Sequence, residues 1–267
     1  MGRLAVEGDK EIYFEDYAGD GRPVVLVHGW GMSCRVWDYN LPAVRAAGHR
    51  VVSLDHRGCG HSDKDFEDVS IAAIAADVVA LCDARGLESP AIVGWSLGAA
   101  VAVEAAEVLG ERAAGLALIG TPSPRYLQAA DWEIGGTPEA MEQTAAALRT
   151  NRAGFLHDLT IGVFKEDPGP AVVEWMWSIF METSPNADLS LIALGELDHR
   201  EVMPRLDLPA LLCVGAADVV VDPRTSAKAA ELLPNGRVVD FAESGHAPFL
   251  EEQEKFEREL LDFLGGL

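Results

Sequence analysis

The sequence predicts an α/β protein in which a mostly parallel central sheet is flanked by helices. Two observations carry this prediction. Short apolar runs recur along the chain, and segments with helical periodicity separate most of them. Strands that alternate with helices form parallel sheets whose two faces are both covered. A chain of 267 residues, 49% of them hydrophobic, can bury a core of this size without disulfides or metals.

Six apolar runs are predicted as buried strands. They are short, rich in Val, Ile, Leu or Ala, and bounded by turn residues. In chain order they span 22–29, 49–58, 90–96, 113–121, 209–218 and 236–246.

Helices are predicted between these strands. Residues 70–86 have one apolar face, and Gly86 is placed to end that helix. An alanine-rich helical pattern follows the third strand, and 224–233 and 248–264 are predicted as the last helices. The apolar face of 70–86 consists of Ile71, Ile74, Val78, Leu81 and Cys82.

The alternation of strands and helices breaks between residues 122 and 208. This stretch has no clear buried strand and reads as several helices joined by Pro/Gly turns, so we expect 1–121 and 209–267 to form the core and 122–208 to form a helical lid insertion. Two interpretations of its aromatic and methionine content stay open: packing onto the core, or an apolar lid over a pocket. The residues concerned are Trp132, Trp175, Trp177, Met141, Met176, Phe180 and Met181.

Charge and composition exclude several classes of function. The formal net charge is −22, which argues against nucleic-acid binding and against anionic membranes, because both need a basic surface. No apolar run reaches the roughly 18 residues of a membrane span, and the N-terminus is acidic where a signal peptide is basic. We therefore expect a soluble, cytoplasmic protein. The four cysteines are scattered and predict buried free thiols instead of a zinc site or disulfides.

The stretch Gly94-Trp95-Ser96-Leu97-Gly98 interrupts the passage from the third strand to its helix. A serine on so sharp a turn stands clear of the sheet, and the two glycines remove side chains that would collide there. The following helix directs its N-terminal N–H groups and positive dipole toward any oxyanion formed at that serine. The pattern therefore predicts Ser96 as a nucleophile.

A serine nucleophile needs a base, and the base needs an acid that orients it. The fifth predicted strand ends at Asp218, and the sixth is followed by His246 in a glycine turn. The chain order Ser96, Asp218, His246 differs from the orders of chymotrypsin-like and subtilisin-like enzymes. Asp222, four residues after Asp218, precedes a proline and is predicted to cap the next helix instead.

The chain resembles the α/β-hydrolase fold family over nearly its whole length, from about residue 12 to residue 264. The resemblance rests on five motifs in the family's order: HGWG at 28–31, DHRGCGHSD at 55–63, GWSLG at 94–98, GAAD at 215–218 and GHAPFLE at 245–251. It implies a catalytic triad of Ser96, Asp218 and His246. It also implies an oxyanion hole made by the backbone N–H groups of Trp30 and Leu97.

The resemblance implies roles for His28 and the turn after the second strand, whereas the other histidines and the lid tryptophans are assigned from the residues themselves. His28 is expected to hold its own loop, and the turn with Asp55, His56, Arg57 and His61 is expected to be structural, so that neither a metal nor a cofactor is predicted. His49, His157 and His199 have no motif around them and are expected on the surface or in the lid. The substrate pocket is predicted to be lined by Trp30, Trp95, Trp175 and Trp177.

The serine in the turn after the third strand, where haloalkane dehalogenases and epoxide hydrolases carry aspartate, implies acyl transfer. We expect a carboxylesterase that cleaves a small, largely apolar ester, thioester or lactone through an acyl-serine. HGWG with GWSLG is similar to the esterases that cleave pimeloyl-carrier-protein methyl ester. Their acidic carrier is a poor electrostatic match for a chain of net charge −22.

Two alternatives to an esterase stay open. The frame from residue 28 to 63 is similar to that of cofactor-free haloperoxidases and perhydrolases. Those enzymes typically have proline where this chain has Gly31, and Gly-Phe-Ser-Met-Gly at the elbow. The other alternative is a hydrolase-like protein that only binds a small molecule.

Overall fold

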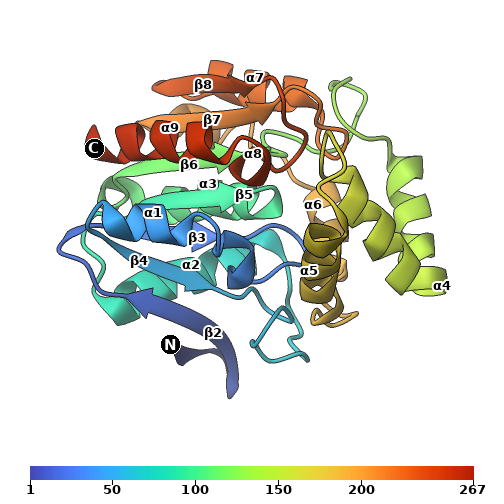
Figure 1. Ribbon diagram of the computed structural model, residues 1–267, viewed down its shortest axis with the longest axis horizontal. Helices are drawn as coiled ribbons and strands as arrows, with labels where there is room; N and C mark the ends of the chain where they lie inside the picture. The colour runs from blue at the N-terminus through green and yellow to red at the C-terminus, as the bar shows by residue number, and fades with distance from the viewer.

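The computed structural model describes all 267 residues and is built around one sheet of eight strands (Figure 1). The strand order is β1-β2-β4-β3-β5-β6-β7-β8. β4, β3, β5, β6, β7 and β8 pair in parallel, whereas β1 and β2 are antiparallel to their neighbours, so the predicted mostly parallel α/β sheet is confirmed. The strands are β1 Gly2–Glu7, β2 Lys10–Tyr17, β3 Gly21–Val27, β4 His49–Leu54, β5 Ala91–Trp95, β6 Gly115–Ile119, β7 Ala210–Gly215 and β8 Gly236–Phe241.

The hairpin of β1 and β2 was not predicted from the sequence. Its strands are rich in charged residues, and only part of β2 is buried, so no apolar run marks them. The turn at Gly8, whose φ is +62°, was the available signal, because Gly-Asp between two alternating segments is typical of hairpins. Buried Glu15 of β2 accepts hydrogen bonds from Tyr13, Tyr17 and Arg35, which satisfies its charge.

Helices cover both faces of the sheet. Figure 1 shows α1 and α9 on the near face and α2 and α3 on the far face. Gly86 ends α2 in the left-handed conformation, as predicted. Ser70, for which no role was predicted, caps the start of the helix by accepting the Ala73 N–H. The helices of the core are α1 Leu41–Ala46, α2 Ile71–Arg85, α3 Leu97–Leu109, α7 Pro223–Leu232, α8 Pro248–Glu251 and α9 Gln253–Gly265, with short 3₁₀ turns at Cys34–Trp37, Gly110–Arg112 and Met203–Arg205.

The single helix predicted at 248–264 is in fact two helices, α8 and α9. The break lies at Glu252, whose backbone has φ −114° and ψ 50°. The Glu252 carboxylate accepts hydrogen bonds from Ser244 Oγ at 2.8 Å and from the Glu243 N–H at 3.0 Å. These tertiary contacts fix the bend, and helical periodicity alone does not report them.

Residues 122–208 contribute no strand to the sheet and hold α4 Pro138–Gly162, α5 Pro170–Met181 and α6 Leu189–Gly195. α4 is kinked at Asn151. Figure 1 shows these helices beyond the ends of the strands. The Thr183 hydroxyl donates to the Gly31 carbonyl at 2.7 Å, which ties the segment to the core. No helix of the protein is both long and apolar enough to cross a membrane.

His199 lies within the 122–208 segment, where it was expected, but it is buried and has polar partners that the sequence did not predict. It is 3% exposed, and its Nε2 lies 3.2 Å from Glu104 Oε1 of α3. Its Nδ1 lies 2.9 Å from Ser123 Oγ. Both ring nitrogens of this buried histidine therefore have partners, which offsets the cost of burying them. The contacts join the end of the 122–208 segment to α3. All four cysteines are buried free thiols, as predicted.

Asp222 caps α7, which separates its role from that of Asp218. Its carboxylate accepts a hydrogen bond from the Arg224 N–H at 2.9 Å, and Pro223 is the first residue of the helix. We expect Asp222→Ala to lower the free energy of unfolding by about 1 kcal/mol, because a cap is lost. Asp222→Asn should be nearly silent, because asparagine caps equally well. Denaturant unfolding of both variants checks this. If both variants lose the same free energy of unfolding, the effect comes from the ion pair with Arg224 and not from the cap.

Candidate active site

The parallel strands bring the predicted triad and oxyanion-hole residues to one edge of the sheet. β3, β4 and β5 run in register, with Val27 beside Leu54 and Gly94. The loops after β3, β5, β7 and β8 therefore begin side by side at the carboxyl ends of these strands, where open α/β sheets bind ligands.

Ser96 lies in a strained turn between β5 and α3. Its φ of +54° and ψ of −124° fall in a region that L-residues rarely occupy. Its N–H donates to the Ile119 carbonyl of β6 at 2.8 Å. A Cβ atom at Gly94 would lie 2.2 Å from the Gly98 carbonyl oxygen, and one at Gly98 would lie 2.3 Å from the Val27 oxygen. The two glycines are therefore required for this turn.

Asp218 and His246 form a buried pair at the ends of β7 and β8. His246 Nδ1 lies 2.7 Å from Asp218 Oδ2, and both side chains are only 2% exposed. The other carboxylate oxygen accepts the N–H groups of Val220 at 2.8 Å and Val221 at 2.9 Å. The backbone thus fixes the carboxylate, which in turn orients the imidazole.

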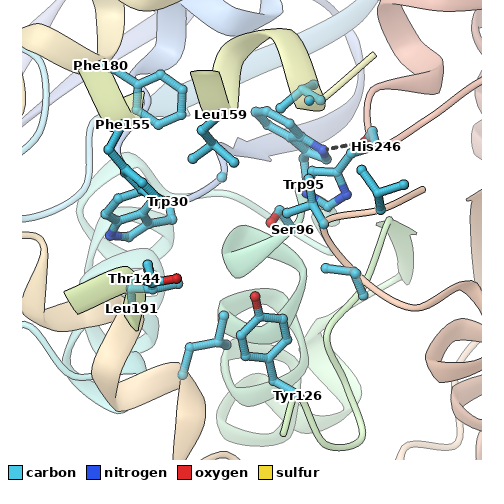
Figure 2. A pocket seen from close by; sticks show the side chains of 17 residues that line it. Trp30, Trp95, Ser96, Tyr126, Thr144, Phe155, Leu159, Phe180, Leu191 and His246 are labelled. Atoms are coloured by element: carbon cyan, nitrogen blue, oxygen red, sulfur yellow. Dashed lines mark hydrogen bonds between the residues drawn. The ribbon is translucent and has the colours of Figure 1, made fainter. Parts of the chain in front are cut away.

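His246 Nε2 is buried and has no hydrogen-bond partner in the protein. Figure 2 shows Ser96 and His246 close to each other at the same cavity, and both line it. A histidine that donates Nδ1–H to a carboxylate keeps the lone pair of Nε2 free to accept a proton.

The backbone of His246 is held at both of its polar groups. Its N–H donates to the Val163 carbonyl, directly after α4, at 2.7 Å. Its carbonyl accepts the indole N–H of Trp95 at 2.8 Å, drawn as the dashed line in Figure 2. Trp95 therefore connects the serine turn to the histidine loop in addition to forming a wall.

Glu251 gives the histidine loop a second attachment. Its carboxylate accepts the Gly245 N–H at 2.8 Å and the Lys165 N–H at 2.6 Å, so it links the residue before His246 to the segment after α4. Burial raises the pKa of Glu251. Neither Val163 nor Glu251 was predicted from the sequence to support the site; the position of Glu251 within GHAPFLE was the available signal.

His28 and the turn after β4 form a hydrogen-bonded support. His28 Nδ1 lies 2.7 Å from the Gly29 carbonyl, and its Nε2 accepts the His56 N–H at 2.9 Å. Burial lowers the pKa of His28 to about 4, so the ring is neutral near pH 7. The Asp55 carboxylate accepts the N–H groups of Cys34 and His61 at 2.7 and 2.8 Å. No group of three or more His, Cys, Asp or Glu side chains is arranged to hold a metal ion.

Two backbone N–H groups near Ser96 are available to a ligand. The Trp30 N–H has no hydrogen-bond partner in the protein. Leu97 is the first residue of α3, where helical N–H groups have no intrahelical acceptor. A Cβ atom at Gly29 would lie 3.3 Å from Ser96 Cβ, so the loop that carries Trp30 passes directly against the serine.

The cavity at Ser96 has a volume of about 310 Å³ and is mostly apolar, since 12 of its 17 lining residues are hydrophobic. Trp30 and Trp95 come from the core, whereas Phe155, Leu159 and Phe180 come from α4 and α5 (Figure 2). Tyr126 and Thr144 add a hydroxyl group each. Helices of the 122–208 segment therefore complete the walls of the cavity.

Trp175 and Trp177 do not line this cavity, contrary to the expectation from the sequence. Trp175 meets Tyr39 edge-on with ring centroids 5.3 Å apart, and the Trp177 indole N–H donates to the Ala153 carbonyl at 3.0 Å. The helical repeat explains the difference, because both residues flank the buried face of α5 and Phe180 belongs to it. This buried face consists of Val173, Met176, Ile179 and Phe180.

Comparisons with known proteins agree with this architecture. The chain is 31% identical to a non-heme chloroperoxidase of Streptomyces lividans over 99% of both chains. It is 28% identical to a pimeloyl-[acyl-carrier protein] methyl ester esterase of Aliivibrio fischeri, over 92% of this chain and 95% of that one. An esterase of Exiguobacterium antarcticum superposes with a TM-score of 0.95 at 26% identity, covering 99% of this chain and 100% of that one. Residues 22–253 match the family model of the alpha/beta hydrolase fold, and the chain belongs to that family.

Proposed function

We propose that this protein is a serine esterase that cleaves a small, neutral, largely apolar carboxylic ester through an acyl-serine intermediate. Family membership and esterase neighbours support a hydrolase. The observation that carries the finer proposal is the meeting of Ser96, in its strained turn, with the buried Asp218–His246 pair at one apolar cavity.

In the proposed reaction, His246 Nε2 takes the hydroxyl proton of Ser96 as the serine oxygen attacks the ester carbonyl carbon. The N–H groups of Trp30 and Leu97 bind the oxyanion of the tetrahedral intermediate, assisted by the positive end of the α3 dipole. His246 then returns the proton to the leaving alcohol. Water repeats the sequence on the acyl-serine and releases the acid. Every step uses groups of the chain and water, with no cofactor.

The cavity favours an uncharged substrate. Apart from His246, no ionisable side chain other than the Tyr126 phenol lines it, so a charged group would be desolvated there without a partner. The net charge of −22 also slows the approach of anionic molecules. We therefore propose carboxylic esters, thioesters or lactones with apolar groups of moderate size.

Perhydrolysis is the second candidate, because non-heme haloperoxidases are among the relatives. Gly31 argues against it. Its φ is +67°, whereas the proline ring fixes φ near −65°. The loop that carries Trp30 therefore follows a path that the proline typical of the haloperoxidase-like enzymes cannot adopt. A protein that only binds its ligand is the third candidate.

One set of assays separates the three candidates. We expect repeated turnover of p-nitrophenyl acetate and butyrate, and negligible peroxide-dependent bromination of monochlorodimedone in acetate buffer. A panel of esters, thioesters and lactones of graded acyl length then defines the substrate class. Release of a single equivalent of p-nitrophenol would instead support a binding protein, and bromination at a rate comparable to hydrolysis would support a perhydrolase.

Phe180 is expected to set acyl-chain selectivity, because it lines the cavity and packs against Trp30 with ring centroids 5.9 Å apart. Phe180→Leu enlarges the cavity and should raise kcat/KM for hexanoate relative to acetate esters about tenfold. Even one methylene that fits or fails to fit an apolar pocket changes the rate by about this factor. Replacement of an aromatic ring by leucine at Trp175, outside the cavity, serves as the control. Trp175→Leu should lower the melting temperature and leave the ratio unchanged. An altered ratio with an unchanged melting temperature would indicate that Trp175 does line the pocket.

A further inference from the structure

Tyr126 places a hydroxyl group without a protein partner into the proposed active-site cavity. It is half-buried, lines the cavity and forms no hydrogen bond within the protein through its phenol oxygen. Figure 2 shows its hydroxyl directed toward Ser96. The hydroxyl is therefore open to the cavity, where a bound ligand can supply the partner that tyrosine O–H groups usually find.

The backbone around Tyr126 is fixed, so the position of the phenol is preorganised. The Tyr126 carbonyl accepts the Gly136 N–H at 3.2 Å, and the Gln128 N–H donates to the Gly136 carbonyl at 2.8 Å. Arg125, the preceding residue, pairs with Asp198 at 2.8 Å. A donor held in this way loses little conformational entropy when a ligand binds.

The phenol remains protonated under ordinary conditions. Burial, followed by the negative charge of Asp218, raises the pKa of Tyr126. Its hydroxyl is therefore a neutral group that can donate one hydrogen bond, and an uncharged oxygen on the substrate is its matching acceptor.

We infer that Tyr126 is a specificity-determining residue that binds a second oxygen of the substrate, so that the preferred esters are neutral and carry a carbonyl, ether or hydroxyl oxygen outside the scissile group. This inference rests on the proposed esterase function and deepens it. An ester with only hydrocarbon groups would cover this hydroxyl without accepting its hydrogen bond, which costs binding energy.

The test uses two pairs of esters that differ by one oxygen function. Methyl pentanoate and methyl 4-oxopentanoate place it in the acyl part, whereas butyl butanoate and 2-methoxyethyl butanoate place it in the alcohol part. Hydrolysis is followed by pH-stat titration, because the nitro group of a p-nitrophenyl ester would itself accept a hydrogen bond. Intrinsic reactivity cancels when the ratio within a pair is compared between wild type and variant.

Tyr126→Phe keeps the ring and removes only the hydroxyl. We expect it to lower the ratio of kcat/KM for at least one pair about threefold to tenfold, through the oxygenated ester, which is the effect of one neutral hydrogen bond. Hydrocarbon esters should be cleaved at wild-type rates or faster. Tyr39→Phe, which makes the same chemical change at an exposed tyrosine outside the cavity, is the matched control and should leave both ratios unchanged.

Three outcomes would overturn the inference. The ratios could be unchanged in Tyr126→Phe, they could change equally in Tyr39→Phe, or kcat could fall equally for all four esters, which would place the phenol on the reacting atoms. Absence of wild-type hydrolysis of any ester would instead contradict the esterase function itself, so the two failures are distinguishable. Thermal melts of both variants confirm that they are folded.

Discussion

Ser96→Ala is expected to abolish ester turnover while the protein remains folded. Loss of a triad serine removes about 10⁶-fold of rate in a serine protease and leaves only the catalysis that comes from binding and the oxyanion hole. Alanine differs from serine only by the hydroxyl oxygen, and the turn already holds a residue with a Cβ atom at φ +54°. The measurement is kcat on p-nitrophenyl butyrate, together with a thermal melt.

Covalent labelling identifies the nucleophile independently of the mutation. A serine-directed phosphonate followed by peptide mass spectrometry should modify Ser96 alone. The protein contains a second array of this kind, in which Ser123 lies 2.9 Å from His199 and His199 lies 3.2 Å from Glu104. Ser123 is fully buried and does not line the cavity, so it should remain unlabelled.

Ser96→Gly provides a control for backbone strain. Glycine adopts positive φ at little steric cost, so this variant should be inactive and melt no lower than Ser96→Ala. A Ser96→Ala protein that retains more than a few per cent of the wild-type rate, or labelling at Ser123, would contradict the proposed mechanism.

The sequence predicted those parts of the fold that depend on local patterns. All six parallel strands, the C-terminal cap of α2 and the glycines around Ser96 follow from residue spacing and from the conformations that each residue allows. The β1–β2 hairpin was not predicted because its charged strands are stabilised by contacts with distant parts of the chain. These are the pairing of β2 with β4 and the contact of Glu15 with Arg35.

The limits of prediction at the site have the same origin. Motif order placed Ser96, Asp218 and His246, but it carried no information on which side of α5 faces the cavity. A rotation of α5 about its own axis would put Trp177 in place of Phe180 or Met176 on the face toward the cavity. Only packing against α4 and Trp30 fixes that rotation. Similarly, Glu251 and Val163 support His246 through contacts between segments about 80 residues apart.

Asp218→Asn is expected to lower kcat about 10⁴-fold and leave folding intact, by comparison with the same change in a serine protease triad. The structure supplies the reason. Asp218 Oδ1 accepts two backbone N–H groups, so the amide oxygen of an asparagine must stay on that side. Its NH₂ group then faces His246 Nδ1, which lies 2.7 Å from Oδ2 in the wild type.

A donor at this position stabilises the wrong tautomer of His246. Nδ1 must then accept a hydrogen bond, the proton moves to Nε2, and the ring can no longer take the proton of Ser96. The imidazolium formed during catalysis also loses the carboxylate that stabilises it. Asp222→Asn makes the same chemical change four residues away at a helix cap and is the matched control. We expect wild-type kcat for Asp222→Asn and similar melting temperatures for both variants. A large loss of kcat in Asp222→Asn, together with wild-type kcat in Asp218→Asn, would show that the acid has been assigned to the wrong residue.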